Sequence, residues 1–119
     1  MNYYVDVILP LPVRGTFTYE LSKDEFTKLD IGYRVAVSFG KRKIYTGIVN
    51  ELHNIKPEAY ETKPIEFIYD NNNLVSKHQI HFWNWLSRYY FVPLGDVLKA
   101  AVPSTFLLES ESLIIKKEL

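Results

Sequence analysis

Hydrophobic and polar residues alternate through the first half of the chain, the pattern of strands that bury one face. The alternation is clearest at 33–39, where Tyr33, Val35, Val37 and Phe39 share one side. It recurs more loosely in four other segments bounded by turn residues, at 3–9, 16–21, 44–52 and 64–69. The segments 33–39 and 44–52 are joined by a short basic loop, so they predict a β-hairpin with a basic tip.

After about residue 74 the apolar spacing lengthens to three or four residues, which is typical of a helix. Ser76 is a candidate N-cap, and we expect one aromatic-rich helix that ends near Phe91. A shorter helix is expected over 96–101, and residues 22–29 predict a short helix or a turn. The fold class is therefore mainly β (α+β), a small β-barrel-like domain of about five to six short strands with a C-terminal aromatic-rich helix.

A chain of 119 residues fits one domain with a terminal extension. We predict that residues 1–105 form the domain. Residues 106–119 are charged around Leu113-Ile114-Ile115, so we expect them to be a linker or the first element of a following domain.

The composition of the chain excludes several kinds of site. Fourteen basic residues balance fourteen acidic ones, so any electrostatic attraction to nucleic acid must be local. The chain has no cysteine, which excludes a disulfide scaffold, a thiolate metal site and a cysteine nucleophile. No apolar run is long enough for a membrane helix, and the N-terminus lacks a secretory pattern. We expect a soluble, cytoplasmic protein that begins at its own start and has no membrane partner.

Catalytic chemistry finds little support in the sequence. His78 and His81 lie three residues apart on the predicted helix, but no further ligands complete a metal site. Phosphate-binding, dinucleotide-binding and hydrolase motifs are absent. We therefore expect a binding module without a metal or an active site.

Two features suggest nucleic-acid contact, and each has a plainer alternative. Basic residues gather on or beside the hairpin, next to Phe39 and Tyr45, at Arg34, Lys41, Arg42 and Lys43. They can contact phosphates while the rings stack on bases, or they can form a solvated loop that discourages aggregation. Gly40 can let a ligand approach the backbone, or it can simply supply a turn conformation.

The aromatic helix also has two interpretations. Its aromatic residues, Trp83, Trp85, Tyr89 and Tyr90, can form a stacking platform or pack the helix against the sheet. We favour packing.

Several segments occur together in one order. They are 4–12 with Thr16-Phe17-Thr18-Tyr19, the G-x-R-V-x-V-x-F-G run at 32–40, Thr46-Gly47-Ile48-Val49, Lys63-Pro64-Ile65, and Tyr89-Tyr90-x-x-Pro93-Leu94-Gly95-Asp96-Val97-Leu98. In this order they resemble the N-terminal domain of the PriA replication-restart helicases (primosomal protein N′). The resemblance covers about residues 3–105.

The resemblance implies a non-enzymatic DNA-binding domain that holds the 3′ end of the nascent leading strand at a stalled replication fork. The whole family protein is an ATP-dependent 3′-to-5′ helicase that reloads the replisome. ATP, magnesium and zinc are then expected only in its other domains, and no cofactor in this one. The implied partners are forked DNA and, through the parent protein, primosome and single-strand-binding proteins. Residues after about 106 lead toward a winged-helix domain.

The resemblance also implies a pocket for the terminal nucleotide. By position, its residues are Phe17 against the base, Gly40 with a backbone group, Lys63 near the nucleotide or its phosphate, and Thr18. The family commonly has Asp where this chain has Thr18. Arg34, Lys41, Arg42 and Lys43 are supporting contacts. A protein-interaction β-barrel that docks a peptide or a neighbouring domain is the alternative function.

Overall fold

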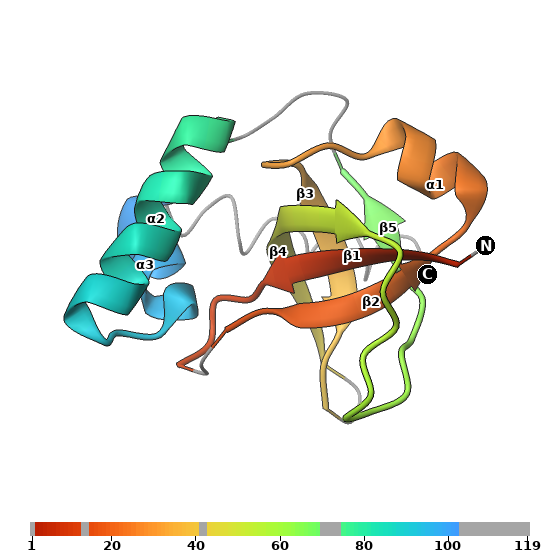
Figure 1. Ribbon diagram of the computed structural model, residues 1–119, viewed down its shortest axis with the longest axis horizontal. Coiled ribbons are helices and arrows are strands. Elements are labelled where there is room, and N and C mark those ends of the chain that lie inside the picture. Colours follow the sequence, from red (N-terminus) through yellow and green to blue (C-terminus); the bar gives the residue numbers. More distant parts are fainter. Residues whose placement is uncertain (1, 13–14, 41–42, 70–74, 103–119) are drawn as a thin grey trace.

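The computed structural model describes residues 2–12, 15–40, 43–69 and 75–102 (Figure 1). Its elements are β1 (Tyr3–Ile8), β2 (Phe17–Leu21), α1 (Lys23–Lys28), β3 (Arg34–Ser38), β4 (Ile44–His53), β5 (Phe67–Ile68), α2 (Lys77–Tyr90) and α3 (Leu94–Ala101). The predicted extension at 106–119 lies outside the described residues.

The five strands form one antiparallel sheet in the order β2-β1-β4-β3-β5, curved into a half-barrel. This confirms the predicted fold class. The β3–β4 hairpin is also confirmed, with Ser38 opposite Ile44 at its closed end. Between β1 and β4 the register shifts, because Asp6 faces Glu51 while Val7 faces Val49. Asn50 is therefore the extra residue of a bulge, which helps the sheet to curve.

The larger core lies on one face of the sheet. Its fully buried strand residues alternate along three strands: Val5, Val7, Val35, Val37 and Val49. Leu9, just after β1, is buried with them. Gly47 lies against this core, where a Cβ would overlap Val7. A glycine at this position lets β4 approach β1 closely.

A second core joins the helices to the sheet. Ile8 of β1 and Ile48 of β4 pack against a helical group, Val75, Ile80, Trp83, Leu94, Leu98 and Val102. The first turn of α2 is closed by a capping box, in which Ser76 accepts from the Gln79 backbone and Gln79 accepts from the Ser76 backbone. The predicted N-cap at Ser76 is confirmed.

The favoured interpretation of the aromatic helix is right for one ring and wrong for the others. Trp83 is only 5% exposed and packs in the second core, whereas Trp85 is 47%, Tyr89 62% and Tyr90 59% exposed. Residues two apart on a helix point about 200° away from each other, so Trp83 and Trp85 cannot both face the core.

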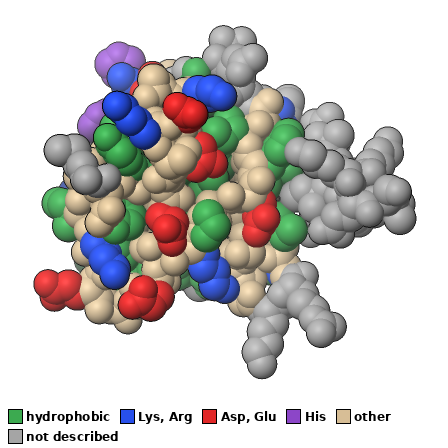
Figure 2. Space-filling model, turned by 90° about the vertical axis from the view of Figure 1, so that its right-hand side faces the viewer, with side chains coloured by type: hydrophobic (Ala, Val, Ile, Leu, Met, Phe, Trp, Pro, Cys, Tyr) green, Lys and Arg blue, Asp and Glu red, His purple; other side chains and the backbone are tan. Residues whose placement is uncertain are grey.

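Among the described residues, no helix is long and apolar enough to cross a membrane. Figure 2 shows the side of the molecule that lies on the right in Figure 1. There, basic and acidic side chains are interspersed.

Candidate functional site

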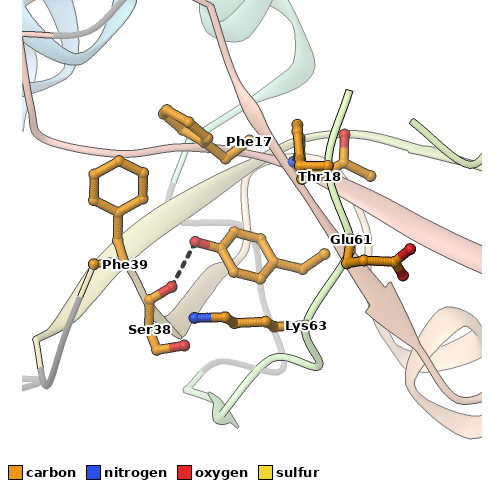
Figure 3. Close-up of a pocket in the computed structure, with 9 residues that line it drawn as sticks. Phe17, Thr18, Ser38, Phe39, Glu61 and Lys63 are labelled. Atoms are coloured by element: carbon orange, nitrogen blue, oxygen red, sulfur yellow. Dashed lines mark hydrogen bonds between the residues drawn. The ribbon is translucent and has the colours of Figure 1, made fainter. Parts of the chain in front are cut away.

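One cavity of about 220 Å³ brings together the four residues predicted to hold a terminal nucleotide, Phe17, Thr18, Gly40 and Lys63. Three segments form it: the start of β2, the end of β3 with the hairpin tip, and the loop before residue 64 (Figure 3). Its other lining residues are Tyr19, Ser38, Phe39, Tyr60 and Glu61. We call this cavity the end pocket.

Two phenylalanines build the aromatic wall of the end pocket. The rings of Phe17 and Phe39 meet edge to face, with centroids 4.6 Å apart and planes at 64°. Phe39 also meets Tyr45 at 6.3 Å. Both phenylalanines are partly buried against the larger core, so the protein holds their orientation without a ligand.

Tyr19 fastens β2 to the hairpin behind this wall. Its hydroxyl donates to the backbone carbonyl of Ser38 at 2.8 Å. Burial, with a smaller contribution from Tyr60, raises the pKa of Tyr19 to about 12. The hydroxyl therefore keeps its proton, and the donor that positions Ser38 persists at neutral pH.

Gly40 supplies a turn conformation, the plainer of the two roles considered for it. Its φ of 71° is in the left-handed region, which favours glycine at this turn. A Cβ here would meet nothing within 4 Å, so the backbone faces open space beside the pocket. The preceding Phe39 N–H donates to the Lys43 carbonyl at 3.0 Å and closes the tip. Lys41 and Arg42 lie outside the described residues.

The loop at 60–63 is held against the open edge of β2. Tyr60 accepts a hydrogen bond from the Thr18 N–H at 2.8 Å, and the Lys63 carbonyl accepts from the Glu20 N–H at 2.9 Å. Two donors of an edge strand are thus satisfied, which also discourages pairing with another chain. The same bonds place the Lys63 side chain in the pocket, where it points toward Ser38 (Figure 3).

The hydroxyl of Thr18 has a fixed polarity. It donates its proton to Asp6 Oδ1 at 2.6 Å, and His53 Nε2 lies 2.8 Å from the same oxygen. His53 Nδ1 accepts from the Ile55 N–H at 3.0 Å, so Nε2 carries the ring proton and donates to Asp6. With its proton used, Thr18 Oγ1 keeps only acceptor capacity, the hydrogen-bonding role that a carboxylate has.

Of the hairpin's predicted basic contacts, the two that the structure describes, Arg34 and Lys43, do not line the end pocket. Arg34 pairs with Ile48 at the other end of β3, and its guanidinium lies 5.6 Å from the Tyr69 ring centroid. Lys43 follows the tip and does not line the end pocket. Among the described residues, no group of three or more His, Cys, Asp and Glu side chains is arranged to hold a metal ion.

Residues 6–103 match the family described as the 3′DNA-binding domain of PriA. This chain belongs to the PriA 3′-DNA-binding domain family. It is therefore a module that binds DNA 3′ ends, as the sequence resemblance predicted, and the protein-interaction alternative is not favoured.

Curated PriA proteins are similar along most of the chain. The replication restart protein PriA of Buchnera aphidicola (subsp. Acyrthosiphon pisum) is 27% identical over 113 residues, 95% of this chain and 15% of the relative. That of Rickettsia prowazekii is 33% identical over 93 residues, 78% and 14%. That of Treponema pallidum is 26% identical over 108 residues, 87% and 16%. The chain thus spans about one-seventh of these PriA proteins.

Sequence reasoning missed part of the end pocket. Tyr19 and Ser38 were assigned to strands only, and Tyr60 and Glu61 lie between the predicted strands 44–52 and 64–69, where no element or role was predicted. Tyr60 is 41% exposed, yet its hydroxyl accepts a hydrogen bond from the Thr18 N–H. That contact joins two residues that are 42 positions apart in the sequence, and no local pattern indicates it.

Proposed function

We propose that the end pocket holds the 3′-terminal nucleotide of a DNA strand. The observation that carries the proposal is the convergence of Phe17, Thr18, Gly40 and Lys63 on one cavity. Their convergence occurs in a chain of the PriA 3′-DNA-binding domain family, which gives the cavity a ligand class.

Each of these residues has a distinct role in the proposal. Phe17 packs on the terminal base, and any base satisfies this contact because all four have a π-face. Gly40 offers backbone groups at close range. Lys63 contacts the terminal nucleotide or its phosphate. Thr18 accepts the proton of the terminal 3′-hydroxyl, supported by Asp6, which holds the proton of Thr18 itself.

A free 3′-hydroxyl is then the feature that the pocket selects. A 3′-phosphate would bring negative charge toward Glu61 and present an acceptor to Thr18, which is itself an acceptor. A continuing strand would present a phosphodiester in place of the free hydroxyl, and its charge and acceptors would meet the same two groups.

We further propose the setting in which this module acts. In a longer protein like its PriA relatives, it would recognise the nascent leading strand at stalled forks, in the cytoplasm, as part of an ATP-dependent 3′-to-5′ helicase. Residues 1–105 would form the binding domain and 106–119 would lead to a winged-helix domain. ATP, magnesium, zinc, and contacts with primosome and single-strand-binding proteins would belong to the rest of that protein. The similarity to replication restart proteins supports this setting.

Fluorescence anisotropy with matched short oligonucleotides tests the pocket. We expect a 3′-hydroxyl end to bind about tenfold or more tightly than a 3′-phosphate end. Lys63→Ala should weaken binding of the 3′-hydroxyl end about tenfold, because a charged contact is lost. Lys99→Ala, which removes the same charge from α3, is the matched control and should bind normally.

Equal binding of the two ends would overturn the end-pocket proposal. Unchanged affinity in Lys63→Ala would remove Lys63 from the site and leave the test to Phe17→Ala. Thermal unfolding of each variant shows whether a loss of affinity reflects a loss of fold.

A further inference from the structure

A row of aromatic rings lies exposed along α2. Phe82 and Trp85 are stacked with centroids 6.1 Å apart and planes at 15°, and Trp85 and Tyr89 at 4.9 Å and 18°. Their spacing of three, four and seven residues places them on one helix face, and Phe82 is 55% exposed. We call these three residues the aromatic face. Exposed rings of this number on a small domain indicate a surface that meets a partner.

The charges on α2 indicate what kind of partner fits. The helix contains Lys77, His78, His81 and Arg88, and no acidic residue in its 14 positions. Two acids lie nearby on other elements: Asp30 pairs with Lys77 at 3.8 Å, and Glu51 lines a hollow with His81 and Arg88. Aromatic rings beside cationic side chains are the composition of surfaces that bind single-stranded nucleic acid.

A groove lies at the C-terminal part of this helix. It has a volume of about 430 Å³ and is lined by Gly15, Asn84, Ser87, Arg88, Phe91, Val92 and Leu94. Gly15 precedes Phe17 by two residues, so the backbones of the groove and the end pocket are at most about 7 Å apart there. In Figure 1 the β1–β2 connection lies between the sheet and the lower end of α2. We call this hollow the helix groove.

We propose that the helix groove and the aromatic face form a second site, for the single-stranded DNA that precedes the terminal nucleotide. Arg88 contacts a phosphate as the strand leaves the end pocket, and bases stack on the aromatic face. The direction of the strand rests on the proposed function, because the end pocket fixes the 3′ terminus. The second site itself has its own rings and its own cation.

A length series separates the two sites. Wild-type protein is titrated with 3′-hydroxyl oligothymidylates of about 2, 6 and 12 nucleotides, lengths that span the range of small single-strand sites. Affinity should rise with length. Trp85→Ala/Tyr89→Ala should bind the shortest strand normally and the longest at least about fivefold more weakly, since each lost stack costs this much or more. Ile55→Ala, at a residue 75% exposed and outside both sites, should match the wild type at every length.

The salt dependence of binding tests Arg88 separately. Arg88→Ala should reduce the slope of log affinity against log salt concentration by about one for the longest strand, because one phosphate contact is lost. Lys99→Ala on α3 is the matched control for charge and should keep the slope.

The proposal is overturned if wild-type affinity does not rise with length, or if Trp85→Ala/Tyr89→Ala keeps the full rise. The second result would mean that the aromatic face serves a protein contact instead. Failure of the end pocket looks different: the shortest strand would bind equally with a 3′-hydroxyl and a 3′-phosphate, whatever happens to the longer strands.

Discussion

The end pocket and the aromatic face use the same kinds of side chain in opposite shapes. In the pocket, the Phe17 and Phe39 rings meet at 64° and are partly buried against the larger core. On α2, the Trp85 and Tyr89 rings are nearly parallel, at 18°, and about half or more of each residue is exposed. A cation accompanies each pair, Lys63 in the pocket and Arg88 in the last turn of α2.

The difference shows how one domain can separate selective recognition of a strand end from sequence-independent binding of the strand. In the pocket, hydrogen bonds hold Thr18, Tyr19 and Lys63 to other parts of the protein, so little ordering remains when a ligand binds. Such a site can discriminate one strand end from another. An exposed row of rings has no comparable enclosure, and it accepts bases in succession without reading them.

The largest expected effect comes from Gly95 in α3, which packs directly against the backbone that follows β1. A Cβ on Gly95 would overlap the carbonyl oxygens of Leu9 and Leu11, and backbone atoms cannot move aside as a flexible side chain can. Gly95→Ala should therefore lower the free energy of unfolding by at least about 3 kcal/mol, measured by urea denaturation.

Gly40→Ala is the matched control, on the pocket side. Its Cβ meets nothing, so only the left-handed φ of 71° opposes alanine, at a cost of about 1 to 2 kcal/mol. Equal losses in the two variants would show that α3 can shift away from the strand end, and that the two regions are less tightly joined than the structure indicates.

The next effect is the contribution of Tyr19, a residue of the end pocket, to the free energy of unfolding, and it depends on pH. Burial, and then Tyr60, raises the pKa of Tyr19 to about 12, against 10.0 for the unperturbed group. The unfolded chain therefore loses this proton first as pH rises. The stabilisation is complete below pH 10 and is lost between about pH 10 and 12, amounting to roughly 2 to 3 kcal/mol.

Tyr19→Phe makes this test specific. Urea unfolding of the wild type and the variant at a series of pH values isolates Tyr19 from the other tyrosines. The variant should be less stable at neutral pH by about 1 kcal/mol, since the bond to Ser38 is lost. Above pH 10 the difference should shrink and then reverse, because only the wild type loses stability as Tyr19 ionises. A difference that does not vary with pH would mean that Tyr19 ionises normally.

The fold could be predicted from the sequence because its signals are local. Alternation predicted each of the four ends of β3 and β4 to within one residue, and Ser76 marked the start of α2. The last strand was expected over 64–69 but is only Phe67–Ile68, because Pro64 cannot donate to a ladder and makes an isolated bridge with Glu20 instead. The wrong part of the helix prediction concerned Trp85, Tyr89 and Tyr90, whose exposure depends on which face of α2 the rest of the protein covers.

The candidate site was accessible to sequence reasoning only in part. The family resemblance indicated Phe17, Thr18, Gly40 and Lys63, and all four line the end pocket, although their contacts with DNA stay a prediction. The support for Thr18 could not be foreseen, because it comes from two other strands. Asp6 of β1 accepts the Thr18 proton, and His53 of β4 contacts the same oxygen of Asp6. Arg34 was grouped with the hairpin tip because the two are close in sequence. In the structure, Arg34 begins β3 and the tip follows the other end of this strand.

The smallest predicted effect concerns two serine N-caps that lie in different surroundings. Ser22 and Ser76 each form a capping box, with Glu25 and Gln79 respectively. Helix α1 buries none of its six residues, whereas α2 buries Ile80 and Trp83. Loss of a serine cap costs about 1 kcal/mol where the helix end must stay folded. Ser76→Ala should therefore destabilise the domain by about that amount, measured by urea unfolding. Ser22→Ala should destabilise it by less, because α1 contributes no fully buried residue and only the partly buried Phe26 to a core.

The same pair of variants sharpens the contrast between the two binding regions. The first turn of α2 precedes the ring stack, which begins at Phe82, so fraying at Ser76 leaves the aromatic face in place. Ser76→Ala should then keep its affinity for long oligonucleotides while losing stability, and hydrogen exchange should be faster in the first turn of α2 than in the turns around Trp85. Weaker binding of long strands by this variant would instead place the DNA contact at His78 and the start of the helix, away from the rings.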